Sequence, residues 1–137
     1  MMSSLTSPSS RSQPNSTAFF AIRQHDLDRK TSVVAVDGEL DLASAPNLKW
    51  TLVDLLDAGR SQIVVDLSSV TFMDSTALGV LIGVNRSLDV GARLAIVCTR
   101  TNVLKIFEFS GLDGTLAIFP TLDEALTYAR RSAAQAG

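Results

Sequence analysis

The chain has 137 residues, of which 46% are hydrophobic, and its net charge is −2. This length suits one domain with a single core, and the apolar fraction is too high for a disordered chain. No run of Lys and Arg occurs, so the charge pattern of a nucleic-acid-binding protein is missing, and no nucleic-acid partner is expected. The sequence also lacks an apolar run of about 18 residues and an apolar signal segment near its start, which predicts a cytoplasmic protein without a membrane partner.

The sequence contains few residues of the types that usually bind transition metals. Cys98 is the only cysteine and His25 the only histidine, which excludes a disulfide within the chain and the usual zinc sites. Cys98 follows an apolar run and is interpreted as a small buried hydrophobic residue. We expect no metal and no cofactor, since no glycine loop of the phosphate-binding type is present.

Ordered structure is expected from Ala18 onward. Residues 1–17 are rich in serine and contain two prolines, which predicts a disordered tail. The apolar run 19–22 predicts a strand, and a polar turn at 26–30 separates it from a β-branched strand that ends at Gly38. We expect these two adjacent strands to pair antiparallel.

A helix is predicted after the second strand. Ser44 is the expected N-cap, Pro46 lies in the first turn where its missing N–H does no harm, and Gly59 fits a left-handed cap at the end. Its apolar stripe consists of four leucines at helical spacing: Leu48, Leu52, Leu55 and Leu56. Trp50 lies outside this stripe and is predicted to pack at the helix edge, with an interface anchor as the alternative.

Three strands and three helices alternate in the rest of the chain. The expected strands are 63–67, 94–98 and 116–119, and the expected helices are 75–89, 102–110 and 122–132, the last opened by a capping box, Thr121 to Glu124. The order ββαβαβαβα predicts an α/β domain with about four helices and a mixed, mostly parallel sheet. This domain is expected to span residues 18–132, followed by a short tail, 133–137.

Ligand sites in such folds lie where strands end and helices begin, which directs attention to the junctions 38–46 and 72–79. Ser75 is expected at or near a helix N-cap, where the helix dipole favours a phosphate by roughly 0.3–1 kcal/mol. The phosphate adds a charge of about −1.5 to −2, which opposes docking of a partner there by several kcal/mol. Phosphorylation would then leave the fold intact and break an interface. Taken alone, however, Asp-Ser-Thr before an apolar helix is more often an ordinary helix start.

Three short motifs resemble one known family. Residues 72–79, with the sequence FMDSTALG, resemble the phosphorylation motif of the STAS domain of anti-sigma factor antagonists. Residues 38–41, GELD, resemble the second-strand signature of that family, and residues 109–112, FSGL, resemble a third motif. The motifs occur in the order and spacing of the family, and the resemblance covers residues 18–131.

The resemblance implies roles for individual residues. Ser75 corresponds to the serine that is phosphorylated by the cognate anti-sigma factor, itself a kinase, and Thr76 is a secondary candidate for phosphorylation. Asp41 corresponds to an acidic residue on a nearby loop that contributes to the kinase-binding face. The implied partner-binding set is Glu39, Asp41, Asp74, Ser75, Thr76, Leu78 and Gly79.

One residue departs from the family pattern, since Ala77 stands where many members have glycine. Alanine is the better helix former by about 1 kcal/mol. It also adds a methyl group at a point of close approach. We therefore expect partner choice or phosphorylation efficiency to differ from those members.

The resemblance implies that the unmodified chain binds an anti-sigma factor of the serine-kinase type and thereby frees a sigma factor. Phosphorylation of Ser75 would release the antagonist, and a separate phosphatase would restore it. The alternative is a STAS subunit of a transporter or signalling assembly, because one fold serves several functions. Catalysis is not expected, since His25 is far from Ser75 in sequence and the Gly-x-Ser-x-Gly elbow is absent.

Overall fold

The computed structural model describes residues 19–109 and 116–131. Within them the predicted order ββαβαβαβα is confirmed. The elements are β1 (Phe20–Asp26), β2 (Thr31–Leu40), α1 (Ala45–Asp57), β3 (Gln62–Met73), α2 (Ser75–Arg86), β4 (Arg93–Val97), α3 (Thr101–Phe109), β5 (Ala117–Phe119) and α4 (Leu122–Ala129). The expected tails 1–17 and 133–137, and residues 110–112 of the third motif, lie outside the described residues.

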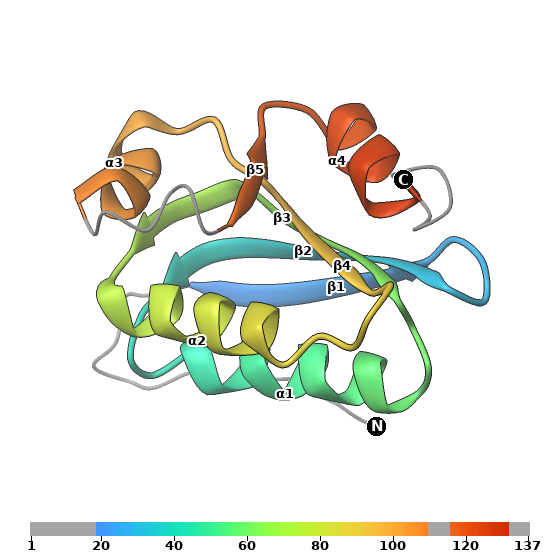
Figure 1. Cartoon of the computed structure of the whole chain (residues 1–137). Helices are drawn as coiled ribbons and strands as arrows, with labels where there is room; N and C mark the ends of the chain where they lie inside the picture. The colour runs from blue at the N-terminus through green and yellow to red at the C-terminus, as the bar shows by residue number, and fades with distance from the viewer. Residues whose placement is uncertain (1–18, 110–115, 132–137) are drawn as a thin grey trace, which may run out of the picture.

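The five strands form one sheet in the order β1-β2-β3-β4-β5. β1 pairs antiparallel with β2 and the other neighbours pair parallel, which confirms the predicted mixed, mostly parallel sheet. Figure 1 shows α1 and α2 side by side on one face of the sheet and α4 on the other. Because β2, β3 and β4 run in the same direction, their carboxyl ends meet at one edge, where α1, α2 and α3 begin.

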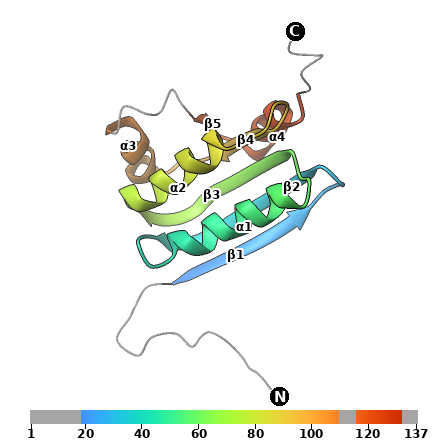
Figure 2. The same ribbon diagram turned by 60° about the horizontal axis from the view of Figure 1, so that its bottom comes forward.

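The core follows from the alternation of side chains along the strands. On one face, Val34, Val65 and Ile96 belong to a large buried cluster with the inward side chains of α1 and α2. Figure 2 shows both helices lying over the sheet. Of the four leucines predicted in α1, Leu48, Leu52 and Leu55 are buried, and Leu56 packs partly buried against them. On the other face, a smaller cluster joins strand residues to α4: Val33, Val64, Ala95, Val97, Ala125 and Ala129.

Three strands run further than predicted. β1 continues past Ile22 to Asp26, β2 continues past Gly38 to Leu40, and β3 continues to Met73 instead of ending near Leu67. β3 stays paired with β2 beyond Leu67 through two irregularities in the register. At each irregularity β3 has one residue more than β2. At the first, Oδ1 of Asp66 accepts hydrogen bonds from the backbone N–H and the hydroxyl of Ser68, at 2.9 and 2.6 Å.

Two helices end earlier than predicted. α2 ends at Arg86 and not at Asp89, because the Ser87 hydroxyl donates to the carbonyl of Val84 at 2.8 Å and closes the last turn. α4 ends at Ala129 and does not continue to residue 132 as predicted. Thr121 is the N-cap of α4 as predicted, since its hydroxyl accepts from the backbone N–H of Glu124 at 3.2 Å. The Glu124 carboxylate accepts from the Thr121 hydroxyl, and not from the Thr121 N–H as in a full capping box.

The backbone of Gly38 generates the first testable prediction. Gly38 has φ +95°, and a Cβ there would lie 1.9 Å from the carbonyl oxygen of Phe19, which accepts from the Glu39 N–H at 2.8 Å. Gly91 has φ +89° but open space around the same position, so it is a matched control. In urea unfolding we expect Gly91→Ala to lower the free energy of unfolding by about 1–2 kcal/mol. Gly38→Ala is expected to lower it by about 3 kcal/mol or more, because the start of β1 must also move. Equal losses would contradict this explanation.

Candidate functional site

The two junctions singled out in the sequence lie side by side in the structure. At the carboxyl edge of the sheet, Glu39 pairs with Phe72 and Leu40 pairs with Met73. The backbone N–H of Asp74 then donates to the carbonyl of Leu40 at 3.2 Å. The loop before α1 and the start of α2 therefore form one continuous surface, although more than 30 residues separate them in the chain.

Asp74, and not Ser75, is the N-cap of α2. Its backbone is extended, and its Oδ1 accepts from the N–H groups of Thr76 at 2.9 Å and Ala77 at 3.3 Å. Ser75 is consequently the first residue of the helix. A carboxylate at this position satisfies two N–H groups that have no partner within the helix and also complements the positive end of its dipole.

The Ser75 side chain is exposed, and within the described residues its hydroxyl has no hydrogen-bond partner. An incoming group can reach this hydroxyl without local unfolding. The electrostatics differ from the sequence-based expectation, because the carboxylate of Asp74 already occupies two of the N–H groups that were expected to favour a phosphate. Repulsion between two unit charges about 4 Å apart is about 1 kcal/mol in water, similar in size to the dipole effect that it opposes. We therefore expect no net gain in stability from a phosphate on Ser75.

The loop between β2 and α1 is organised by Asp41 and Ser44. Ser44 occupies the predicted N-cap position of α1, but its side chain makes no capping hydrogen bond. Oδ1 of Asp41 instead accepts from the N–H groups of Ala43 and Ser44, at 3.0 and 3.1 Å, and the Asp41 carbonyl accepts from Ala45 at 2.8 Å. Ser44 is only 7% exposed, and its hydroxyl donates to the carbonyl of Glu39 at 2.8 Å. Asp41 thus starts the helix, and Ser44 attaches the loop to β2.

The remaining residues of the predicted partner-binding set differ in exposure. Glu39, Asp41, Asp74 and Thr76 are half-buried at this edge, and Gly79 is exposed. Leu78 is only 4% exposed and lies in the core, so it supports the surface from below without forming part of it. Ala77 is fully buried as well, so its methyl group packs inside the domain and is not presented to a partner.

Two apolar residues at this edge were missed in the sequence analysis. Leu42, in the loop before α1, is 71% exposed, and Phe72, near the end of β3, is 47% exposed. Each is an apolar residue beside a turn or a helix start, which is the only signal that the sequence gives. We define the Ser75 surface as the non-buried residues of this edge: Glu39, Asp41, Leu42, Phe72, Asp74, Ser75, Thr76 and Gly79.

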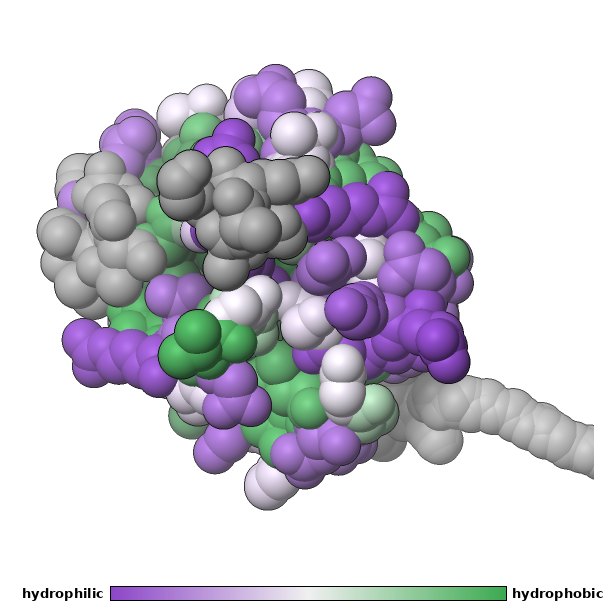
Figure 3. All heavy atoms as spheres, turned by 45° about the vertical axis from the view of Figure 1, so that its right-hand side comes forward, coloured by the Kyte–Doolittle hydropathy of each residue, from purple (hydrophilic) through white to green (hydrophobic). Residues whose placement is uncertain are grey.

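The opposite end of the molecule is polar and held by ion pairs. Figure 3 shows that hydrophilic side chains gather on the side that carries the β1–β2 turn. There Arg60 bridges to Asp26 at 3.3 Å, and Arg130 bridges to Asp28 at 3.3 Å. Hydrogen bonds from Ser32 and Gln24, together with the charge of Arg60, hold the pKa of Asp26 below its usual range.

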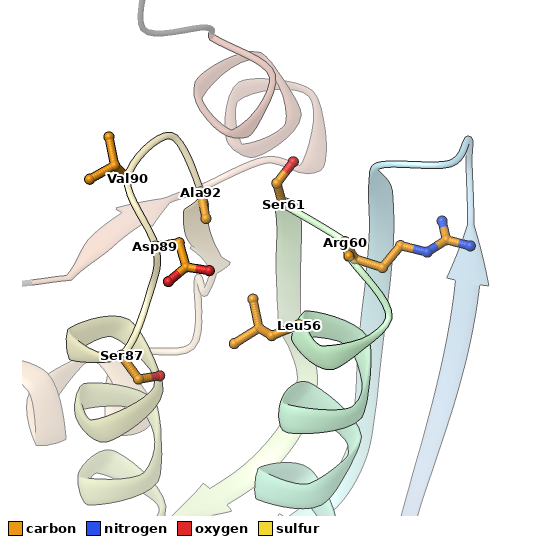
Figure 4. A pocket seen from close by; sticks show the side chains of 8 residues that line it. Leu56, Arg60, Ser61, Ser87, Asp89, Val90 and Ala92 are labelled. Carbon is orange, nitrogen blue, oxygen red and sulfur yellow. The ribbon is translucent and has the colours of Figure 1, made fainter.

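The hollow between α1 and α2, the potential metal-ligating residues and Cys98 do not form a second candidate site. A hollow of about 250 Å³ lies between the ends of α1 and α2, smaller than the ~300–1,000 Å³ usual for small-molecule sites. Figure 4 shows that the Arg60 side chain points away from this hollow, toward the β1–β2 turn. In the part of the chain that the structure describes, no group of three or more His, Cys, Asp or Glu could hold a metal ion. Burial raises the pKa of the Cys98 thiol, which disfavours the reactive thiolate.

Among residues 19–109 and 116–131, no helix combines the length and the apolar character that a membrane-crossing helix needs.

Comparison with known proteins gives a consistent result. The family model described as STAS domain matches residues 21–125. The anti-sigma-F factor antagonist RsfB of Mycobacterium tuberculosis is 28% identical over 99 residues, which cover 72% of this chain and 81% of RsfB. The matched region includes most of the described domain.

Solved structures agree with this match. The crystal structure of an anti-sigma factor antagonist from Mycobacterium paratuberculosis has a TM-score of 0.73 at 32% identity and covers 87% of this chain and 98% of its own. The structure of the Bacillus cell fate determinant SpoIIAA in its phosphorylated form has a TM-score of 0.62 at 27% identity. The match covers 80% of this chain and 100% of the SpoIIAA chain. One of these related folds therefore exists with a phosphate attached.

The capping geometry of α2 predicts a measurable loss of stability. Asp74→Ala removes the acceptor for two backbone N–H groups and is expected to lower the free energy of unfolding by about 1 kcal/mol. Asp74→Asn keeps a good capping side chain and is expected to lose less. Asp57→Ala is the control and should not lower stability, because Asp57 is an exposed carboxylate at the C-terminal end of α1, where a negative charge opposes the helix dipole. Urea unfolding of the three variants measures this, and an Asp74→Ala variant as stable as wild type would exclude the proposed cap.

Proposed function

The chain belongs to the STAS-domain family, and from that premise we propose that it is an anti-sigma factor antagonist regulated by phosphorylation of Ser75. In this proposal the unmodified chain binds an anti-sigma factor of the serine-kinase type through the Ser75 surface and thereby frees a sigma factor. The protein is not itself a catalyst, and it acts in the cytoplasm.

The observation that carries the proposal is the position of the Ser75 hydroxyl. It is exposed on the first turn of α2, and within the described residues no other group bonds to it. The groups around it are fixed, because Asp74 is held to Leu40 and the loop of Asp41 is held by Ser44. A partner can therefore dock on a rigid surface and reach the hydroxyl in one defined position, which is what phosphoryl transfer requires.

Phosphoryl transfer would use the hydroxyl of this chain and the ATP of the partner. The Ser75 Oγ attacks the γ-phosphorus, and the bond between that phosphorus and the β,γ-bridging oxygen breaks. ADP leaves, and a base of the kinase takes the hydroxyl proton. Hydrolysis of the resulting ester by a separate phosphatase returns the hydroxyl and releases inorganic phosphate.

The phosphate would end binding through its charge. The Ser75 surface already carries Glu39, Asp41 and Asp74, and the phosphate adds about −1.5 to −2 next to them. A partner surface shaped for the neutral hydroxyl would have to desolvate this charge without pairing it, which costs several kcal/mol. The domain itself tolerates the group, because the Ser75 side chain lies outside the core.

The alternative, a STAS subunit of a transporter or signalling assembly, has less support. The relatives described above are named as antagonists of anti-sigma factors. A transporter subunit would not need the exposed Ser75 hydroxyl beside an acidic loop.

Substitutions of Ser75 test the switch. Using a purified anti-sigma factor of the serine-kinase type from the genome that encodes this chain, we expect Ser75→Ala to bind as wild type does and Ser75→Glu to bind about 10-fold or more weakly. Intact mass after incubation with the kinase and ATP should show one added phosphate on wild type and Thr76→Ala, and none on Ser75→Ala. Phosphate on Ser75→Ala that is lost when Thr76→Ala is added would instead identify Thr76 as the acceptor. Equal affinity of the alanine and glutamate variants of Ser75 would remove the switch.

Glycines on α2 test where the partner lies. Gly79 and Gly83 are both exposed, and a Cβ at either position would meet nothing within 4 Å. Alanine at either site should therefore stabilise the helix by about 1 kcal/mol. Gly79 lies one turn from Ser75 and Gly83 two turns, so we expect Gly79→Ala to weaken binding about 10-fold and Gly83→Ala to weaken it less. Calorimetric titration and thermal unfolding of both variants separate the two effects. Unchanged binding by Gly79→Ala would show that the partner does not approach this turn.

A further inference from the structure

The outward side of α1 carries an exposed tryptophan, Trp50, which is unusual for a helix on the surface of a domain. A surface helix normally places charged and polar residues opposite its buried stripe. In α1 the buried stripe consists of Ala45, Leu48, Leu52 and Leu55. At 100° per residue, Trp50 lies opposite this stripe, with Pro46 and Val53 within about 60° of it on one side and Asp54 and Asn47 on the other. Asp57 falls between Pro46 and Trp50, so the outward side mixes polar and apolar side chains, and Trp50 is its largest apolar residue.

Exposure confirms that these residues are not covered by the domain. Trp50 is 58% exposed, so the predicted packing at the helix edge is wrong and the alternative, an interface anchor, is favoured. Pro46 is exposed and Val53 is half-buried. Leu42, which precedes α1 in the chain and belongs to the Ser75 surface, is exposed as well. We call Leu42, Pro46, Trp50 and Val53 the Trp50 face.

We infer that the Trp50 face is a second part of the surface that binds the anti-sigma factor, with the Trp50 indole inserted into an apolar pocket of that protein. The inference rests on the proposed function. It assigns the partner an apolar pocket in addition to the region that meets Ser75.

The Trp50 face adjoins the Ser75 surface, which indicates that the same partner protein covers both. Leu42 lies in the loop that Asp41 and Ser44 hold rigid, so the Trp50 face begins inside the Ser75 surface. Figure 1 shows α1 and α2 side by side, with both helices starting at the same end of the sheet. A protein seated on the start of α2 and on the Asp41 loop is thus already next to Pro46 and Trp50.

The size of the patch argues against a dimer of this chain. Tryptophan side chains bury about 150–250 Å² when fully covered, so the exposed part of Trp50 offers on the order of 100 Å². The whole Trp50 face then amounts to a few hundred Å², the size of a functional patch. A stable dimer buries about 800 Å² on each partner, so this face needs an adjoining surface to make a lasting interface. The Ser75 surface adjoins it.

The contact of Lys49 with Trp50 supports an anchoring role. The Lys49 Nζ lies 5.4 Å from the centre of the indole ring, which restrains the ring from one side. A side chain held in place before binding loses less conformational entropy when it is buried. Trp is also among the residues that most often dominate binding energy at interfaces.

Substitution of Trp50 tests the inference with full-length protein and the purified serine-kinase-type anti-sigma factor described above. We expect Trp50→Ala to weaken binding about 10-fold or more and Trp50→Phe to weaken it less. The melting temperature should stay within about 2 °C of wild type, because the side chain is not part of the core. Val90→Ala, which removes a fully exposed apolar side chain from the turn before β4, is the matched control and should change neither quantity.

Trp50 is the only tryptophan, so it is also a unique spectroscopic reporter. Labelling this chain with 5-fluorotryptophan gives one ¹⁹F signal, which should shift when the unlabelled anti-sigma factor is added and should not shift with Ser75→Glu. If wild type binds the anti-sigma factor, Trp50→Ala binds it with the same affinity and the ¹⁹F signal does not shift, this inference is wrong and the proposed function still stands. Wild type that fails to bind would overturn the proposed function and the inference with it. A shift that depends on the concentration of this chain alone would show that a second copy covers the face, and would also overturn it.

Discussion

The hydrogen bonds of Asp74 join the parts of this domain on which the candidate site depends. Its N–H reaches the carbonyl of Leu40 at the end of β2, and its carboxylate reaches the first free N–H groups of α2. One residue therefore ends β3, starts a helix and attaches that helix to the neighbouring strand. The exposed hydroxyl of Ser75 and the loop of Asp41 keep their relative positions because of this arrangement, and the surface they form is rigid before any partner arrives.

The fold was largely predictable because its signals are local. Alternating strands and amphipathic helices, with turn and cap residues between them, indicated the order of elements and the mixed sheet, and both are confirmed. The ends of elements were less predictable, because tertiary contacts decide them. β3 runs to Met73 since it pairs with β2 through two irregularities, and nothing in the isolated sequence around Leu67 indicates that pairing. α2 ends early because the Ser87 hydroxyl bonds back to Val84.

The candidate site was likewise predictable in some properties and not in others. The resemblance located Ser75, Asp74 and Asp41 at one edge, and the structure brings their segments together. It could not assign the hydrogen bonds within that edge, since Asp, Ser and Thr are all good caps. Asp74 caps α2, whereas Ser44 bonds to β2 instead of capping α1, and Asp41 orders the loop before that helix. Exposure was the least predictable property. Leu78 and Ala77 turn inward with the helix, whereas Leu42, Phe72 and Trp50 remain exposed because no element of the part of the chain that the structure describes covers them.

The order of strands in the sheet is the same as their order in the chain. Each strand consequently finds its neighbour one step back along the polypeptide, which keeps the closing loops short and favours rapid folding. During synthesis, the segment from β1 to α2 leaves the ribosome before the segment from β4 to α4. The earlier segment contains every residue of the Ser75 surface and of the Trp50 face, so the binding determinants are made before the strands and helices that complete the sheet.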